Sequence, residues 1–286
     1  MPEIWTLLAA LTKLGLYLGA LNAVGRVLVA TVFAPDLSLS ALRRGALAWI
    51  GVAVFCAVAG FGLRAAELTG ALSGLWDAEM LSLLWGTAAG NALTWRLAGL
   101  AAMAVGLMFV SGWGPWVALA GGAGVLVSFA RVGHVADLDL PWITALLWLH
   151  LVAAAFWIGI LAPLIWLTVT PGDSAPAVRV GERFGRIAAV ALPVLGVTGV
   201  VMAWWLVGSV DGLLTGYGLW LMLKLAAVLA FLWLGAANKL RHVPALAAGA
   251  PGADMALRRS LRLEQGAALL VLAATAALTS FVALPG

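Results

Sequence analysis

Four side chains in otherwise apolar stretches of the chain are of the types that bind a soft metal ion: His134, His150, Met202 and Met222. Imidazole nitrogens and thioether sulfurs suit copper, and thioethers favour its reduced form, Cu(I). The chain has a single cysteine, Cys56, so it lacks the paired thiolates of a typical structural zinc site. These residue types therefore indicate a copper site that binds Cu(I) rather than a zinc site.

The two histidines differ in the depth that their positions predict. His134 ends one apolar run and is followed by Asp137 and Asp139, whose carboxylates would raise the local concentration of cations. His150 follows Pro141, near the start of the next run, by nine residues, and nine helical residues rise by roughly 13 Å. An imidazole at that depth is equally consistent with a hydrogen-bonded residue of the helix packing, and two histidines can also bind a b-type haem. The residues alone leave these three uses open.

The elements that must hold these side chains are membrane-spanning helices. Of 286 residues, 64% are hydrophobic and only 10% are charged, whereas soluble domains carry about 25% charged residues. A helix needs about 20 apolar residues to cross a bilayer, and in lipid a helix pairs all of the backbone of such a run. We therefore predict an all-α polytopic membrane bundle with about eight transmembrane helices, and exclude a soluble enzyme. The predicted spans are residues 5–33, 45–68, 92–110, 114–134, 142–169, 185–208, 217–238 and 259–282.

The charged residues between the spans predict the orientation of the bundle. Basic residues gather after the first, fifth and seventh spans, and acidic residues gather in the loops of the other side. By the positive-inside rule the basic loops are cytoplasmic, so both chain ends lie on the outer face. The isoelectric point near 9.8 therefore reflects topology, and we expect the lipid bilayer but no nucleic acid as a partner. A short amphipathic segment at about 75–85 is expected to lie on the outer surface.

Two segments share a pattern that suggests an internal repeat. Thr87 and Thr215 each precede a glycine by three residues, and that glycine precedes a cation, Arg96 or Lys224, by six. We therefore expect a single integral membrane domain built from two halves of four spans each, in the same orientation. Chance similarity between helices rich in Leu, Ala and Gly is the alternative. The predicted boundaries are 1–286 for the domain and 1–134 and 141–286 for its halves.

Ionisable side chains within the spans need a partner, because an unpaired charge in hydrocarbon is costly. Lys13, Arg96 and Lys224 lie in the outer halves of their spans, where they can reach the outer headgroups, pair with an acid or bind an anion. In the inner half, Arg26 of the first span is placed to meet Glu264 of the last, and we expect an ion pair there. A proton relay through Glu264 is the alternative.

Several motifs, taken in order along the chain, resemble those of a known family. The chain is similar to the bacterial copper-resistance protein D family (CopD and PcoD) at Gly133-His134, Trp148–Gly159, Arg183–Ala188 and Leu257–Glu264. The resemblance covers residues 90–282 well and the preceding residues loosely. Gly185, where the family commonly has serine, and Val135, after the first histidine, depart from the family pattern, and neither departure removes a candidate ligand.

The resemblance implies a copper-handling, multi-pass protein of the bacterial cytoplasmic (inner) membrane. In that membrane the orientation predicted from the charged loops gives periplasmic N- and C-termini, and we expect a protein that is not an enzyme. Copper would pass from periplasm to cytoplasm by way of His134 and then His150, with Met202 or Met222 completing a low-coordinate Cu(I) site. A separate periplasmic copper-binding protein of the CopC type would deliver the ion. Two alternatives stay open: a b-haem electron carrier, and an assembly scaffold that passes copper to a partner without transporting it.

Overall fold

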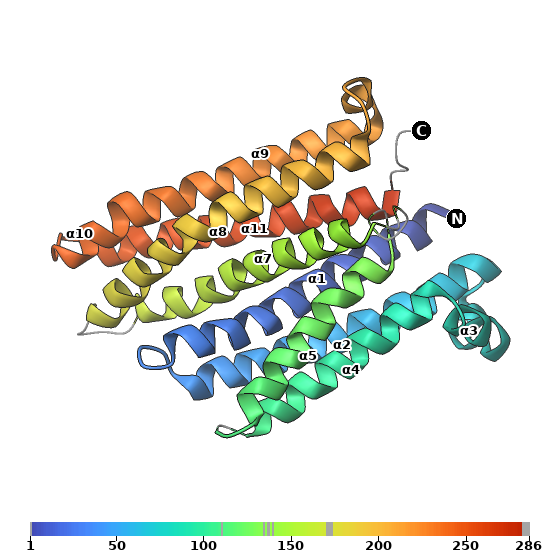
Figure 1. Ribbon diagram of the computed structural model, residues 1–286, viewed down its shortest axis with the longest axis horizontal. Helices are drawn as coiled ribbons and strands as arrows, with labels where there is room; N and C mark the ends of the chain where they lie inside the picture. The colour runs from blue at the N-terminus through green and yellow to red at the C-terminus, as the bar shows by residue number, and fades with distance from the viewer. Residues whose placement is uncertain are drawn as a thin grey trace.

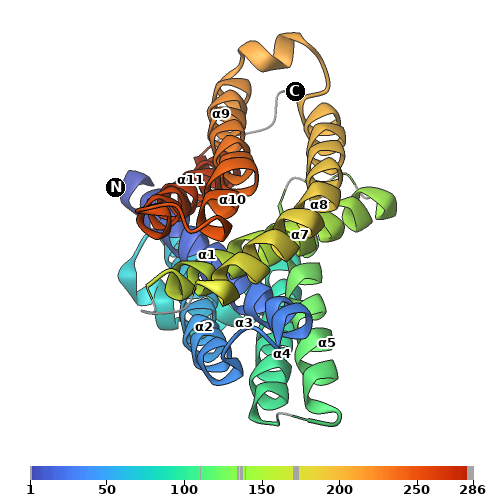
Figure 2. The same ribbon diagram turned by 90° about the vertical axis from the view of Figure 1, so that its left-hand side faces the viewer.

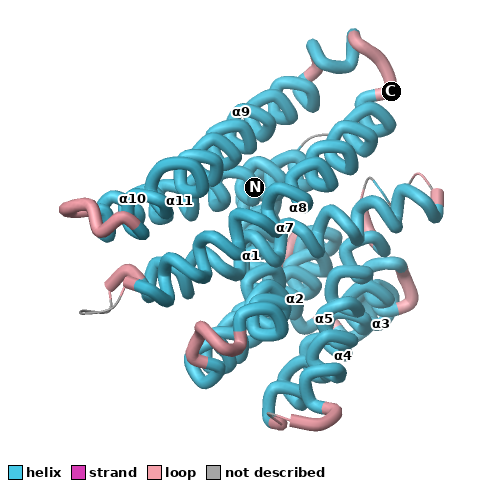
Figure 3. The backbone as a smooth tube through the Cα atoms, turned by 60° about the vertical axis from the view of Figure 1, so that its left-hand side comes forward, coloured by secondary structure: helices cyan, strands magenta, loops and turns pink. Residues whose placement is uncertain are grey.

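The computed structural model describes residues 2–109, 111–133, 135, 138, 140–169 and 174–281, and every regular element in these residues is a helix (Figure 3). The predicted all-α membrane bundle is confirmed. The long helices are α1 (Pro2–Phe33), α2 (Leu39–Thr69), α4 (Ala88–Met108), α5 (Gly114–Ser128), α7 (Pro141–Leu167), α8 (Ala175–Val207), α9 (Gly216–Ala237) and α11 (Ala253–Phe281). The short ones are η1 (Leu72–Trp76), α3 (Ala78–Trp85), η2 (Phe129–Arg131), η3 (Asp211–Leu214), η4 (Asn238–His242) and α10 (Val243–Ala247).

Seven helices in the described part of the chain are long and apolar enough to cross a membrane: α1, α2, α4, α7, α8, α9 with its continuation through α10, and α11. The remaining predicted span, 114–134, which is the fourth along the chain, is shorter than expected. Helix α5 ends at Ser128, and its 15 residues rise by roughly 22 Å, against about 30 Å of hydrocarbon. It still runs antiparallel beside α4, so the start of α1 and the end of α11 lie at the same end of the bundle (Figure 1).

The charged loops divide the bundle into two unlike ends. The end where α1 stops and α2 begins, here called the basic end, also holds η4 and the start of α11 (Figure 1). The other end, here called the α3 end, holds η1, α3 and η3. Cations of the basic end are Arg43, Arg44, Arg179, Arg183, Arg186, Lys239, Arg241, Arg258, Arg259 and Arg262, and they outnumber its acids Asp36, Glu182 and Asp254. The α3 end holds the acids Glu67, Asp77, Glu79 and Asp211 together with Arg64.

Helices α1 and α7 cross in close contact at two glycines, Gly25 and Gly159. A Cβ atom on Gly25 would lie 2.8 Å from the Cα atom of Gly159, and one on Gly159 would lie 2.6 Å from the Cα atom of Gly25. Lipid tails are as apolar as side chains, so membrane helices associate by such close packing at small residues rather than by a hydrophobic driving force. The crossing places α7 in the middle of the bundle, between α1 and α8 (Figure 2).

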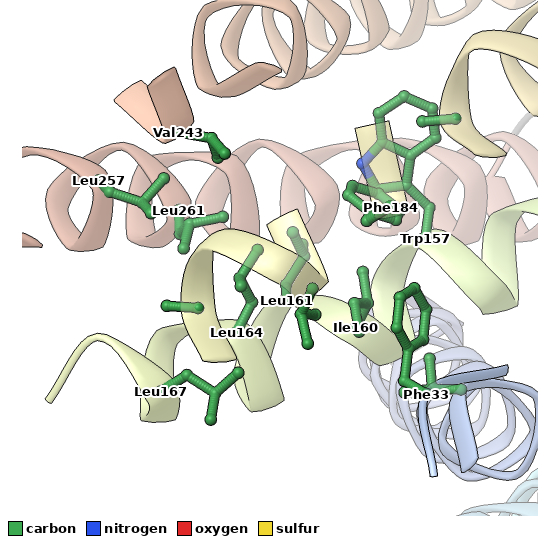
Figure 4. Packing of buried hydrophobic residues seen from close by; sticks show 14 of the residues in the cluster. Phe33, Trp157, Ile160, Leu161, Leu164, Leu167, Phe184, Val243, Leu257 and Leu261 are labelled. Carbon is green, nitrogen blue, oxygen red and sulfur yellow. The ribbon is translucent and has the colours of Figure 1, made fainter. Parts of the chain in front are cut away.

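Two hydrophobic clusters meet along α1 and α7. The first fills the space between α1, α2, α4 and α5 and includes Leu100, Met103 and Val125. The second joins the basic-end half of α7 to α8 and α11, and Figure 4 shows Leu161 and Leu164 facing Leu257 and Leu261. The α3-end half of α7 has fewer buried neighbours, which leaves room for a cavity there.

Candidate functional site

A large cavity of about 730 Å³ lies in the α3-end half of the bundle. Its wall comes from α1, α2, α4, α7, α8, α9 and α11, and Figure 2 shows α8 and α9 standing apart at this end. Ligand sites in proteins commonly have volumes of about 300–1,000 Å³. The cavity is therefore large enough for an ion with its ligands, and we call it the large cavity.

His150 lines the large cavity from α7, and a hydrogen bond sets the orientation of its ring. Its Nδ1 atom lies 3.0 Å from the Thr198 hydroxyl of α8. That hydroxyl donates its own proton to the Val194 carbonyl oxygen, at 2.6 Å, so it accepts from His150. Nδ1 therefore carries the imidazole proton, and Nε2 keeps its lone pair. This is the tautomer that a metal-binding histidine adopts when its second nitrogen is held by a neighbouring group.

Met202 lines the same cavity, from α8. It lies four residues after Thr198 and so on the same face of the helix, and its side chain is buried, with 8% exposed. An imidazole from α7 and a thioether from α8 are thus presented to one cavity. This pair of soft ligands suits Cu(I).

The structure does not bring all four predicted ligands together. Met222 is 44% exposed on α9 and does not line the large cavity, although its neighbours Leu221 and Lys224 do. His134, with Asp137 and Asp139, lies outside the described residues. The residues flanking His134, Gly133 and Val135, do line the cavity. Within the described residues, no cluster of three or more His, Cys, Asp or Glu side chains is arranged to hold a metal ion.

Cys56 also lines the large cavity, although the sequence alone did not indicate a ligand role for it. Its free thiol lies on α2 and borders the large cavity, close against α1, where a Cβ atom on Gly15 would lie 2.5 Å from Sγ. Its neighbours Ala57 and Gly60 also line the cavity. The helical spacing of these small residues could have indicated a face of α2 turned toward a cavity, but not that His150 borders the same space.

Among the described residues, the charged side chains that line the large cavity are Lys13, Arg64, Arg96, Lys224 and Glu67. Lys13 donates to the Thr279 carbonyl oxygen at 2.6 Å, and Arg96 donates to the Ser128 hydroxyl at 3.2 Å. The ion pairs between described residues, Arg179–Asp36 and Arg258–Asp254, lie at the basic end. Basic side chains thus outnumber acidic ones among the described residues that line the cavity, and Asp137 and Asp139 lie outside those residues.

The expected ion pair between Arg26 and Glu264 is not present; this prediction was wrong. Glu264 instead accepts hydrogen bonds from Trp157 Nε1, at 2.7 Å, and from Asn238 Nδ2, at 2.6 Å. The Arg26 guanidinium lies against α2, where a Cβ atom on Gly45 would meet it. The reason is the rotation of α11, which turns Glu264 toward α7 and α9 rather than toward α1.

The fold defines a multi-pass membrane protein whose helix bundle encloses a cavity lined by His150 and Met202. Residues 1–139 match the family model described as Copper resistance protein D-like, N-terminal domain, and residues 178–278 match the one described as Copper resistance protein D. The chain belongs to the copper resistance protein D family, as the motifs predicted. No curated protein and no solved structure matches the chain.

Proposed function

We propose that this protein moves copper from the periplasm toward the cytoplasm through a site formed by His150 and Met202 in the large cavity. Membership of the copper resistance family supports copper as the substrate. The main support for this site is the orientation of the His150 ring. Its Nδ1 atom is hydrogen-bonded to Thr198, which leaves the Nε2 lone pair available to bind copper. Met202 supplies a thioether at the same cavity.

The charge at the two ends of the bundle supports an orientation of the protein in the membrane. Cationic loops favour the cytoplasmic side, so the basic end is cytoplasmic and the α3 end is periplasmic. Both termini then face the periplasm, in the bacterial inner membrane. The large cavity opens in the periplasmic half, where it receives copper.

The basic side chains in the described lining of the large cavity favour delivery by a carrier over capture of the free ion. Four of the five charged side chains that line the cavity among the described residues are basic, so soft ligands rather than these charges would hold Cu(I). A periplasmic copper-binding protein of the CopC type would hand over copper by ligand exchange, with the metal bound throughout. Of the histidines in the described residues, His150 lines this cavity and His242 lies at the basic end, so a b-haem there would need His134, outside the described residues, as its second imidazole.

The test of the site is a matched pair of methionine variants. Met202→Leu should weaken Cu(I) binding at least about tenfold, or about 1.4 kcal/mol, because it removes a soft ligand while keeping the volume. Met222→Leu should leave the affinity unchanged, because Met222 does not line the cavity. Competition with a chromophoric Cu(I) chelator measures both, and X-ray absorption should lose sulfur scattering in Met202→Leu alone. Equal affinities, or loss of binding in Met222→Leu, would contradict the assignment of Met202.

A further inference from the structure

A small cavity of about 280 Å³ lies in the basic-end half of the bundle, between α7, α8, α9 with η4, and α11. Its wall is apolar except at Glu264, Asn238, Lys239 and the indole of Trp157. Trp157 lines the large cavity as well, and so stands between the two. We call this space the small cavity.

Glu264 is a buried acid held by neutral groups. It is 1% exposed, and the N–H groups of Trp157 and Asn238 each donate to one of its carboxyl oxygens. No ion pair within the described residues involves Glu264. A buried carboxylate without a cation carries a large desolvation cost, which binding a positive charge removes.

Asn238 has an unused acceptor beside that carboxyl group. The residue is 6% exposed, and its Oδ1 atom has no hydrogen-bond partner. Half a turn of the carboxamide exchanges Oδ1 with Nδ2. When a proton binds Glu264 Oε2, the new O–H group can donate to Oδ1 after that turn. The turn moves the unpartnered position from Oδ1 to the Nδ2 group, so Asn238 can form one hydrogen bond with Glu264 in either protonation state of the acid.

Trp157 connects this acid to the boundary between the cavities. Its ring packs against Phe184, at 5.5 Å between centroids, and against Phe231, at 5.2 Å, and Figure 4 shows Trp157 beside Phe184. A Cβ atom on Gly235 would lie 2.8 Å from Trp157 Cζ2 and 3.3 Å from Glu264 Oε1. The indole is therefore held in place by packing and by the one hydrogen bond that it donates to Glu264.

We propose that Glu264 and Asn238 form a proton-binding site, and that protonation of Glu264 weakens its hold on Trp157 and so controls passage between the two cavities. A hydronium ion at the basic end gives up a proton, which forms an O–H bond at Oε2, and the O–H bond of the donor breaks to leave a water molecule. Lys239, on η4, is the other titratable side chain of the cavity wall, while α7 and α8 contribute no titratable group to it. On α1, the charged residue Arg26 has its guanidinium against Gly45 of α2 rather than beside Glu264. The control of passage rests on the proposed transport function, whereas proton binding does not.

Glu264→Gln imitates the protonated acid, because its amide oxygen accepts from Trp157 and its NH₂ group can donate to Asn238 Oδ1. The matched control is Glu182→Gln, on the exposed surface of α8 at the basic end. Infrared difference spectra between acidic and alkaline pH, on the full chain in liposomes, should show a titrating carboxyl C=O band in the wild type and in Glu182→Gln. The band should be absent in Glu264→Gln and shifted in frequency in Asn238→Leu. An unchanged spectrum in Glu264→Gln would overturn the proton site, whatever the protein transports.

Copper uptake into the same liposomes tests the control of passage. The wild type and Glu182→Gln should show pH-dependent uptake, and Glu264→Gln should lose that dependence while binding Cu(I) within about twofold of the wild type. Full pH dependence in Glu264→Gln would overturn the coupling. If the wild type takes up no copper, the proposed transport function fails, and the infrared result still decides the proton site.

Discussion

Replacing His150 with alanine is expected to reduce copper accumulation by cells to the level of cells without the protein, at equal amounts of protein in the membrane. The change removes the imidazole whose Nε2 is the proposed ligand at the large cavity. The packing should survive, because the Thr198 hydroxyl keeps its bond to the Val194 carbonyl oxygen. The measurement is cell-associated copper by elemental analysis, normalised to membrane protein.

Two further variants show whether the effect comes from metal binding. His242→Ala is the matched control at the basic end and should accumulate copper normally. Thr198→Val keeps the imidazole but removes the group that orients it, and losing such a supporting hydrogen bond typically costs about 10–100-fold in metal affinity. Normal accumulation in His150→Ala would rule out the proposed path, because that path requires the His150 imidazole.

Replacing Gly159 with leucine is expected to prevent stable assembly of the bundle. A side chain at this position would meet the backbone of α1, where the Gly25 Cα atom lies 2.6 Å from an added Cβ atom. Backbone atoms cannot move aside as a flexible side chain can, so α1 and α7 must separate. Overpacking commonly costs about 1–3 kcal/mol, and a clash with backbone in the middle of the bundle should reach or exceed the upper value.

The control for this variant is Gly51→Leu, in α2, where an added Cβ atom meets nothing within 4 Å. It should assemble like the wild type. Size-exclusion chromatography of detergent-solubilised protein, with the midpoint of thermal unfolding, compares the two variants. Equal midpoints for Gly159→Leu and the wild type would show that the α1–α7 contact is not tight in the membrane.

The positions of the membrane helices followed closely from the apolar runs, because lipid forces such runs to be helical. The exception is α5, where the apolar run continued to residue 134 but the helix ends at Ser128 and η2 follows. Hydropathy reports which residues tolerate lipid and not where a helix stops. The predicted repeat of residues 1–134 and 141–286 stays a prediction, although Gly25 and Gly159, at comparable places in the two halves, are in contact.

The position of Met222 could have been predicted more sharply. It lies two residues before Lys224, which places the two about 200° apart around the helix. Lys224 belongs to a stripe on α9 that lines the large cavity at helical spacing, so Met222 belongs to the opposite face. The stripe consists of Tyr217, Leu221, Lys224, Val228 and Phe231. By contrast, no local signal pairs Glu264 with Trp157, which are 107 residues apart.

Composition and the placement of charges were enough to predict a helical membrane bundle and the order of its spans. The reason is that lipid requires apolar runs to be helical, and that charged residues stay in the loops outside the lipid. The motifs added the resemblance to the copper resistance protein D family, which the family models confirm. The tertiary structure decided which faces of neighbouring helices are in contact. Helices that are apolar on all sides can rotate about their axes in lipid without penalty, and close contacts such as that between Gly25 and Gly159 select one rotation. That selection turned His150 and Met202 into one cavity, left Met222 outside it, and enclosed Glu264 beside Trp157.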